Sequence, residues 1–176
     1  MSTLIILAHP NKEAARINAS LAEPLLEKGD VTLHDLYAEY PDHIIDAKLE
    51  QRLLLEHTHI VLQFPLHWYS VPGLLKDWMD RVLERGWAYG DDGGPGFLRG
   101  KSLQVAVSTS EDAREYEPGR PQYFTIDQFL VPLKATALRL GMTWETPIVV
   151  DNVLEDGSGL RNHVGTYIDG VGAGRR

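Results

Sequence analysis

The chain has 176 residues, of which 43% are hydrophobic, and it contains no cysteine. Its length suits one domain spanning residues 1–176, and the absence of cysteine excludes disulfides, thiolate nucleophiles and cysteine-ligated metals. A formal net charge of -8 argues against a nucleic-acid partner, whose usual footprint is a basic patch, and against adsorption to anionic lipid.

Membrane-spanning and targeting segments are not apparent in the sequence. No stretch approaches the roughly 20 apolar residues that cross a bilayer, and the apolar run from Leu4 to Ala8 is too short for a signal-peptide core. We expect a cytoplasmic protein; peripheral attachment at the inner face of the membrane through a protein partner stays open.

Apolar periodicity predicts strands that alternate with helices along the chain. Continuous apolar runs, which are typical of strands buried on both faces of a sheet, predict strands at 4–7, 31–33 with Leu36, 59–64, 103–107 and 144–150. Helical spacing predicts helices over 17–26, over 49–54, from Pro72 until Gly86, and over 124–140 with Gly141 as the C-cap. Residues 37–45 are expected to form a loop.

Proline and glycine affect the last two predicted helices. Pro132 predicts a kink or a late start in the helix over 124–140, because proline lacks the N–H that a helix needs. Beyond Glu155 the sequence predicts a weak helix, broken by glycines at 157, 159, 165 and 170.

Five strands that alternate with helices imply a parallel sheet with right-handed crossovers. The strand count suits an α/β, flavodoxin-like three-layer sandwich, with a five-stranded parallel sheet in the order 2-1-3-4-5. In such sheets the ligand lies beyond the carboxyl ends of the strands, at the switch point between strands one and three. We therefore expect the site in the loops after strands one, three and four. The long irregular stretches 86–100 and 110–123 are candidate functional loops.

The loop after the first strand, residues 9–18, leads into a helix at this edge. A helix N-terminus presents backbone N–H groups and the positive end of the helix dipole, so it binds phosphate. His9 could donate to a phosphate oxygen, Arg16 could add charge and Asn18 could supply an amide. The alternative is that His9 and Asn18 only close a turn and cap the helix. No glycine-rich dinucleotide fingerprint or Walker lysine motif is present.

The loop after the third strand holds Trp68 and Tyr69 between Pro65 and Pro72. Flat aromatic side chains on a proline-stiffened loop suit contact with a planar ring, and backbone amides here could bind the heteroatoms of a flavin. The alternative is an aromatic cluster that packs against the start of the following helix.

Other polar residues receive structural interpretations. The seven histidines include no His-Glu-x-x-His pairing, so we expect no metal site, and without a Gly-x-Ser-x-Gly elbow we expect no serine hydrolase. Asp42 and Asp46 are interpreted as solvated turn residues or, alternatively, as part of a loop that docks a basic partner. Leu74 and Trp78 are interpreted as core or dimer contacts, and residues 90–96 as a mobile hairpin or lid.

Several blocks of the sequence resemble a known family. His9-Pro10, Asn18, the block FPLHWYSVP at 64–72, the block LKDWMDRV at 75–82 and the block GWAYG at 86–90 occur as in the NAD(P)H:quinone oxidoreductases, a family of flavodoxin-like flavoproteins. The segment LYAEYPD at 36–42, followed by Ile45-Asp46, is similar to the ancillary subunits of glutathione-gated potassium-efflux antiporters. The resemblance extends from about residue 3 to residue 150.

This resemblance implies a homodimer that binds FMN or FAD non-covalently at the dimer interface and transfers hydride from NADPH or NADH to a quinone by ping-pong exchange. Carried onto this sequence, it implies three groups of flavin-binding residues and one catalytic residue, Tyr116, which would donate a hydrogen bond during reduction. The phosphate would be held by His9, Ala15, Arg16, Ile17 and Asn18; the isoalloxazine ring would be lined by Pro65, Leu66, His67, Trp68 and Tyr69; the pyrimidine end would meet backbone N–H groups of Ser108, Thr109, Ser110 and Glu111.

Three positions depart from the family pattern. Ala15 replaces a serine, which removes one phosphate contact worth about 1–2 kcal/mol, and Arg16 could compensate. The segment 108–111 replaces Thr-Thr-Gly-Gly, so the glycines that permit close backbone approach are absent. Gln122 replaces a histidine, which leaves proton delivery to Tyr116 or water. We expect Glu111 to point outward or toward a cation, because an inward carboxylate would repel the negative charge that develops on a flavin.

Two function classes follow. The first is a flavin-dependent NAD(P)H dehydrogenase that reduces quinones. The alternative is a regulatory subunit that uses the same fold to activate a potassium/proton efflux antiporter, with weak or no turnover. The intact 65–69 segment favours a retained flavin, whereas the altered 108–111 loop favours the regulatory role. A flavodoxin-type electron carrier is a third, less favoured interpretation.

Overall fold

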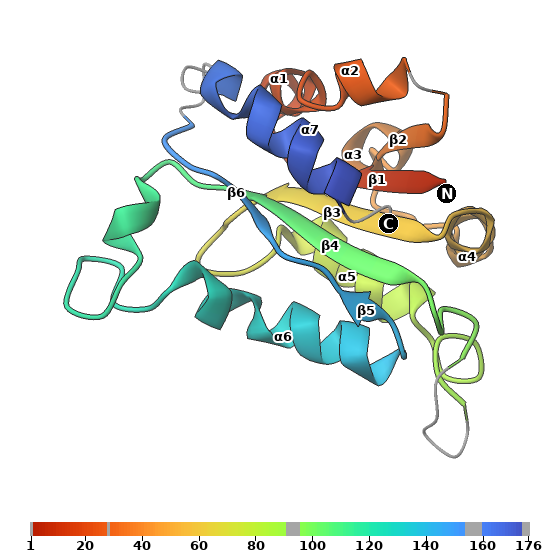
Figure 1. Ribbon diagram of the computed structural model, residues 1–176. Helices are drawn as coiled ribbons and strands as arrows, with labels where there is room; N and C mark the ends of the chain where they lie inside the picture. The colour runs from red at the N-terminus through yellow and green to blue at the C-terminus, as the bar shows by residue number, and fades with distance from the viewer. Residues whose placement is uncertain (1, 28, 91–95, 154–159, 174–176) are drawn as a thin grey trace.

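The computed structural model describes residues 2–27, 29–90, 96–153 and 160–173. At its centre lies a parallel sheet in the order β2-β1-β3-β4-β5 (Figure 1). Its strands are β1 (Thr3–Leu7), β2 (Val31–Asp35), β3 (His59–Pro65), β4 (Ser102–Ser108) and β5 (Thr143–Trp144). The predicted strand order is therefore confirmed, and the carboxyl ends of β1, β3 and β4 meet at one edge of the sheet.

The strand predicted at 144–150 is divided into two short strands. β5 ends at Trp144, and a separate strand, β6 (Ile148–Val150), pairs with the C-terminal half of β4. Pro147 lies in the break and has no N–H to donate to a ladder. The Gln104 side chain of β4 donates instead to the Thr146 carbonyl at 2.9 Å. The prediction of one continuous strand is wrong at this point.

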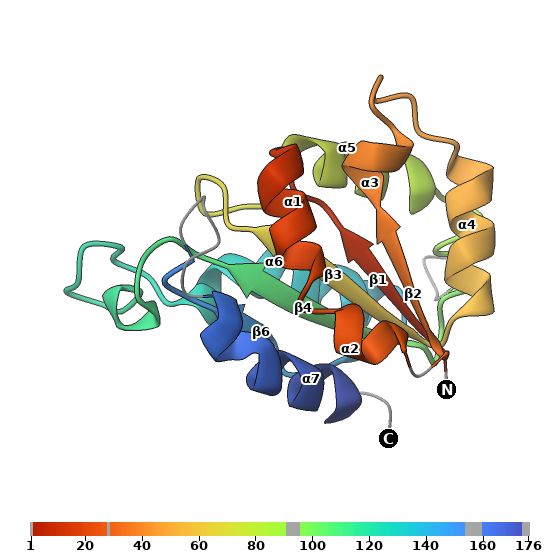
Figure 2. The same ribbon diagram turned by 90° about the horizontal axis from the view of Figure 1, so that it is seen from above.

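Helices cover both faces of the sheet, so the predicted three-layer arrangement is confirmed (Figures 1 and 2). One face carries α1 (Lys12–Ala19), α2 (Glu23–Leu26) and α7 (Val164–Ala173); the other carries α3 (Leu36–Glu39), α4 (Ala47–Glu56), α5 (Gly73–Val82) and α6 (Ile126–Arg139). Side chains alternate between the faces along each strand. Ile5 thus joins the core under α7, whereas Leu4 and Ile6 join the core that contains Leu74 and Trp78 of α5.

Two helical elements near the N-terminus differ from the sequence prediction. The helix expected over 17–26 is two helices, α1 and α2, and the first begins earlier, at Lys12. Leu36 opens α3 instead of extending the second strand into a loop. The reason is local, because the Asp35 carboxylate accepts hydrogen bonds from the N–H groups of Tyr37 and Ala38 and caps the helix.

The last helix, α7, forms although it contains several glycines. A Cβ at Gly170 would lie 2.7 Å from Ile148 Cγ1, so this glycine lets α7 approach β6 closely. Gly157 and Gly159, also expected to break the helix, lie outside the described residues. The glycine pattern therefore marks close packing at Gly170, where the sequence predicted a break.

Helix α6 begins at Ile126, where Thr125 and Gln128 form a capping box. A late start after Pro132 is therefore wrong, and the proline lies inside the helix. Gly141 follows the end of the helix with a φ of 71°, which confirms its predicted place at the C-terminal end of α6.

Within the described ranges, no helix combines the length and apolar character that a membrane span requires.

Candidate functional site

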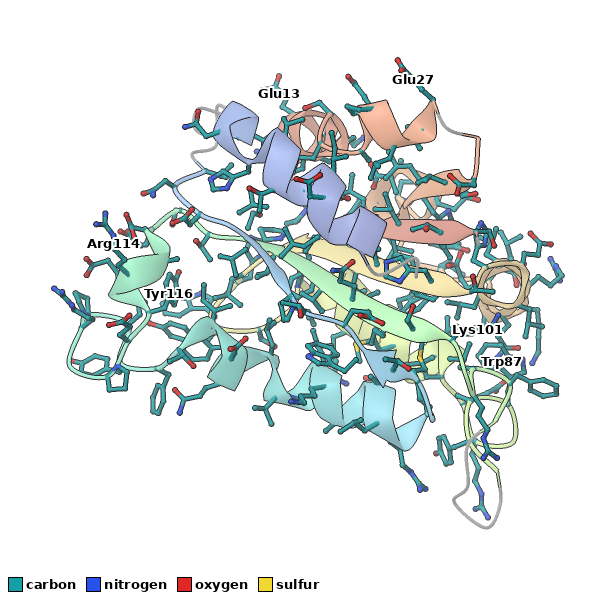
Figure 3. All side chains as sticks on the ribbon, in the orientation of Figure 1. Glu13, Glu27, Trp87, Lys101, Arg114 and Tyr116 are labelled. Atoms are coloured by element: carbon teal, nitrogen blue, oxygen red, sulfur yellow. The ribbon has the colours of Figure 1, made fainter. Side chains whose placement is uncertain are left out.

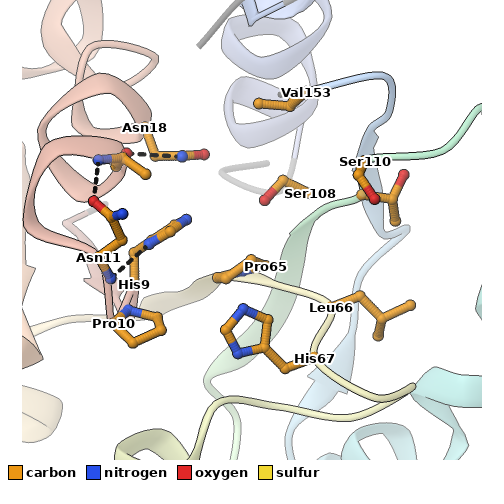
Figure 4. A pocket seen from close by; sticks show the side chains of 12 residues that line it. His9, Pro10, Asn11, Asn18, Pro65, Leu66, His67, Ser108, Ser110 and Val153 are labelled. Atoms are coloured by element: carbon orange, nitrogen blue, oxygen red, sulfur yellow. Dashed lines mark hydrogen bonds between the residues drawn. The ribbon is translucent and has the colours of Figure 1, made fainter. Parts of the chain in front are cut away.

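A pocket of about 320 Å³ lies where the loops after β1, β3 and β4 meet (Figure 4). It is at the sheet edge that the strand order predicts for a ligand. The predicted flavin-binding residues that line it are His9, Asn18, Pro65, Leu66, His67, Ser108, Thr109 and Ser110. Three segments that are far apart in the sequence therefore form one concave site.

His9 lies in the pocket wall at the start of α1. Its Nδ1 accepts a hydrogen bond from the Asn11 N–H at 3.2 Å, so the neutral ring carries its hydrogen on Nε2, which can donate to an anion. Asn11 Oδ1 accepts hydrogen bonds from the N–H groups of Glu13 and Ala14 at 3.0 and 3.1 Å, and thereby caps α1. The sequence analysis missed Asn11, although an asparagine directly before a helix is a capping signal.

Asn18 reaches the pocket from the C-terminal end of α1 with a buried side chain. Its Nδ2 donates to the Ala14 carbonyl, one turn earlier, at 2.9 Å, so the helix itself orients the amide. Ala15 is buried and is not among the residues that line the pocket. The side chains of Arg16 and Ile17 lie outside what the structure describes, so their phosphate contacts stay predictions.

The loop after β3 makes a tight turn that presents two aromatic residues. His67 and Ser70 exchange backbone hydrogen bonds of 2.9 Å, and the residues between them, Trp68 and Tyr69, have φ angles of 46° and 63°. Left-handed backbone costs an L-residue about 1 kcal/mol, and such strain often accumulates at functional sites. Trp68 is 92% exposed, next to the pocket residue His67.

Tyr69 lines a neighbouring, mostly apolar pocket of about 170 Å³ between α5 and α6. Leu66 lines both pockets, so the two adjoin. Phe129 of α6 also lines the second pocket and packs edge-on against Tyr116, with 6.3 Å between ring centroids. The sequence analysis missed Phe129, because an aromatic residue inside an amphipathic helix is indistinguishable from an ordinary core residue.

Backbone hydrogen bonds hold the loop after β4. The Thr109 N–H donates to the Val150 carbonyl, and the Val153 N–H donates to the Thr109 carbonyl, both at 3.0 Å. Among the residues that the structure describes, no hydrogen bond is found from the backbone N–H groups of Ser110 and Glu111, so both can donate to a ligand. The Glu111 residue is exposed, as expected of a side chain that points outward.

Tyr116 follows the short 3-10 helix η1 (Ala113–Glu115) and is buried behind the pocket lining. Burial raises the pKa of its phenol, the nearby Glu111 carboxylate raises it further, and a hydrogen bond with Thr109 lowers it. The net pKa is raised, so the phenol keeps its proton at neutral pH.

Figure 3 places Tyr116 at the pocket end of the sheet and Trp87, from the 86–100 loop, at the opposite end. The long loop after α5 therefore lies away from this chain's own pocket. Residues 91–95, which belong to the predicted lid, lie outside the described residues.

The remaining polar residues act in turns. Asp46 caps α4, and Asp42 accepts a hydrogen bond from the Ile44 N–H at 3.0 Å. In the part of the chain that the structure describes, no group of three or more His, Asp and Glu side chains could hold a metal ion.

A family model for the flavodoxin-like fold matches residues 1–167. The chain belongs to this flavodoxin-like family. The uncharacterized NAD(P)H oxidoreductase YrkL of Bacillus subtilis (strain 168) is 46% identical over 142 residues, which cover 81% of this chain and 80% of the relative. The glutathione-regulated potassium-efflux system ancillary protein KefG of Cronobacter sakazakii is 42% identical over 147 residues, which cover 84% and 79%. These names confirm the resemblance noted in the sequence.

Solved structures share the fold of this flavodoxin-like protein over nearly its whole length. General stress protein 14 of Treponema denticola, solved in complex with FMN, has a TM-score of 0.87 and 31% identity, covering 99% of both chains. An NADPH-quinone reductase from P. pentosaceus has a TM-score of 0.80 and 32% identity, covering 95% of both. A thermophilic tryptophan halogenase from Streptomycin violaceusniger has a TM-score of 0.86 and 41% identity, covering 96% of this chain and 97% of its own.

The donor set of the pocket fits a flavin mononucleotide. The His9 ring suits a phosphate group at one side, near the positive end of the α1 dipole, while the Glu13 and Ala14 N–H groups already donate to Asn11. The N–H group of Ser110 suits a carbonyl oxygen at the other side, with the Glu111 N–H one residue beyond the lining, and Pro65 and Leu66 supply an apolar wall between the two ends. Donors at both ends and an apolar middle match a phosphate joined to a planar heterocycle.

Proposed function

We propose that this protein is a flavin-dependent NAD(P)H:quinone oxidoreductase and that its flavin is FMN. The observation that carries the proposal is that the loops after β1, β3 and β4 form one pocket. At one end of this pocket the His9 ring can donate a hydrogen bond to an anion, and at the other end backbone N–H groups can donate to a ligand. The names of the relatives and the FMN complex of one of them support the reaction class and the cofactor. A flavin held here would supply hydride transfer between a nicotinamide and a quinone.

The pocket residues would divide the work of holding the flavin. His9, near the positive end of the α1 dipole, would bind the phosphate, and the 65–67 segment would form one wall of the ring site. The N–H groups of Ser110 and Glu111 would bind the pyrimidine oxygens as fixed donors, which need no reorganisation when negative charge develops there. One open ring face would admit the nicotinamide and then the quinone, which gives ping-pong exchange.

Tyr116 would hold a proton near the ring. Burial and the Glu111 charge raise the pKa of its phenol, so its O–H stays available as a hydrogen-bond donor at neutral pH. The edge-on contact with Phe129 holds the Tyr116 ring in place. Tyr116 would thus take the role that a tyrosine and a histidine share in related quinone reductases, since position 122 is glutamine in this chain.

A second copy of the chain would cover this site. Val131 and Leu138, which are 55% and 60% exposed, are seven residues apart and therefore lie on one side of α6, and Phe124, which is 54% exposed, directly precedes the N-cap of the helix. Trp68 adds an exposed aromatic side chain beside the pocket. Apolar surface of this kind is favourably buried against a subunit. Light scattering should therefore show a dimer, and Leu138→Glu should weaken it.

The alternative role, a regulatory subunit of a potassium/proton antiporter, is supported by the KefG relative and by the acidic loop before α4. Ile44 in that loop is 71% exposed between Asp42 and Asp46. An apolar side chain flanked by carboxylates suits a basic partner surface. In this role the protein would act at the inner face of the membrane through its partner.

An absorption spectrum tests both roles. The purified protein is incubated with excess FMN or FAD, desalted, mixed with NADPH or NADH, and then given a quinone. Flavin bands that bleach with the nicotinamide and return with the quinone would support the reductase. This result would also distinguish the protein from a halogenase, which is the activity named for one of the similar solved structures. Bands that do not bleach would favour the regulatory subunit, and a colourless protein would overturn the flavin proposal.

A further inference from the structure

A buried chain of hydrogen bonds joins α7 to α1 across the face of the sheet that both helices cover, by way of the central strand β3. The Tyr167 hydroxyl of α7 donates to Gln63 Oε1 of β3 at 2.7 Å, and Gln63 Nε2 donates to the Asn18 carbonyl of α1 at 2.9 Å. Exposure is 0% for Tyr167, 3% for Gln63 and 4% for Asn18. The chain of bonds therefore runs entirely through the interior.

These polar groups are not required to fill space. Tyr167 belongs to a core of apolar side chains that includes Ile5, Val61 and Val171, where phenylalanine would avoid the cost of burying a hydroxyl. A buried polar network whose members are satisfied specifies one arrangement of the elements that it connects. We therefore look for the function of this network in what it positions.

The network ends at the phosphate side of the pocket. Asn18 lines the pocket, and its Nδ2 donates to the carbonyl of Ala14, another lining residue. Helix α1 has only 8 residues, too few to be stable by itself. Its described buried side chains are Ala14, Ala15 and Asn18, which offer little apolar area. The hydrogen bond from Gln63 ties α1 directly to the central strand β3.

We propose that Gln63 and Tyr167 are positioning residues that set α1 for binding of the flavin phosphate. Neither side chain touches the phosphate; they act through Asn18 and the helix. The inference rests on the proposed function, and it requires that recognition of the phosphate, not of the ring, depends on the Tyr167 hydroxyl.

The first test compares two ligands in two matched variants. Tyr167→Phe deletes the hydroxyl, and Tyr40→Phe is the control, because the Tyr40 hydroxyl is also buried and donates to Glu50 at 2.6 Å under the other face of the sheet. Fluorescence titration measures dissociation constants for FMN and for riboflavin, which lacks the phosphate.

We expect Tyr167→Phe to raise the FMN dissociation constant about fivefold and the riboflavin constant less than about twofold. Tyr40→Phe should leave both constants unchanged. An equal change for both ligands in Tyr167→Phe, or no change for either, would overturn the inference.

The second test needs no flavin. Amide hydrogen exchange should be faster in residues 12–19 of Tyr167→Phe and of Gln63→Leu than in the wild type, and unchanged there in Tyr40→Phe. Unaltered protection of α1 would overturn the inference. A wild type that binds neither flavin would instead overturn the proposed function, and the exchange result alone would then decide whether Tyr167 positions α1.

Discussion

The Tyr69 ring stacks on the Phe129 ring with 4.8 Å between centroids and 26° between planes. This contact joins the strained turn after β3 to α6, and Phe129 also meets Tyr116 edge-on. One phenyl ring thus supports two residues for which the sequence predicts roles at the flavin. The geometry of the site depends on α6, although the pocket lining comes from other elements.

Removing this ring should loosen both tyrosines. Phe129→Ala should lower the free energy of unfolding by about 2–3 kcal/mol, because it deletes a partly buried ring and its three aromatic contacts, with Tyr69, Tyr116 and Phe124, and it should slow quinone reduction. Urea denaturation and steady-state kinetics measure the two effects. Phe97→Ala, at a side chain that is 60% exposed and stacks on Trp87, is the control, and an equal loss of stability in both variants would contradict the prediction.

Tyr116→Phe should slow quinone reduction by about 100-fold and leave FMN affinity unchanged.

In the wild type the raised pKa of the Tyr116 phenol should keep the rate of quinone reduction unchanged across neutral pH and let it fall only in alkaline solution. Glu111→Gln should move this alkaline limb to lower pH, because the Glu111 charge raises the pKa of Tyr116. A pH–rate profile that is the same for Glu111→Gln and the wild type would contradict this assignment.

Glu111→Arg tests the orientation of the same residue. Because Glu111 is exposed, its charge should contribute little at the ring, and the rate of flavin reduction by NADPH should stay unchanged. Stopped-flow absorbance measures that rate. A clearly faster reduction would mean that the carboxylate opposes the charge that develops on the flavin.

Trp68→Asn should raise the stability of the protein and lower its affinity for FMN. Asparagine tolerates a left-handed backbone better than tryptophan, and Trp68 is 92% exposed, so the unfolding free energy should rise by about 0.5–1 kcal/mol. FMN affinity should fall, because the ring would lose an aromatic neighbour. Tyr123→Asn is the matched control, since Tyr123 has a φ of 62° and is 70% exposed; it should gain stability with unchanged FMN affinity. Equal FMN affinity in both variants would argue against a role for Trp68.

Far from the pocket, His34 and Glu50 form a buried pair at 2.9 Å. Burial alone would lower the pKa of His34, but the hydrogen bond and charge of Glu50 outweigh it and raise the pKa above 6.5. Burial alone would raise the pKa of Glu50, but hydrogen bonds from His34, Tyr40 and Trp78 outweigh it and lower the pKa below 4.5. The stability that protonated His34 contributes is therefore lost as pH rises through the pKa of His34 in the folded state. The stability that ionised Glu50 contributes is lost as pH falls through the pKa of Glu50 in the folded state.

His34→Gln should accordingly flatten the pH dependence of stability. The wild-type free energy of unfolding should fall as pH rises above 6.5 and through the raised pKa of His34, and the variant should show a smaller fall. Urea denaturation at several pH values measures it. His43→Gln, at an exposed histidine, should keep the wild-type slope, and a wild-type slope in His34→Gln would refute the assignment.

The strand order and the edge of the sheet that carries the site can be predicted from the sequence. Both follow from local signals, because buried parallel strands are written as continuous apolar runs and alternate with amphipathic helices. The loops at His9, at Pro65 and at Ser108 could therefore be placed together before any coordinates were known. Asn11 was within reach of the same reasoning, since its capping role depends only on its immediate neighbours.

Contacts between residues that are distant in the sequence could not be predicted in this way. The break at Pro147 is closed by Gln104, Phe129 supports Tyr69 and Tyr116, and Tyr167 reaches Asn18 through Gln63. Gly170, whose type alone predicts a weak helix, is instead required where α7 meets β6. Periodicity reports which side of an element is buried, but hydrogen bonds and ring contacts between residues up to 104 positions apart depend on how the layers pack.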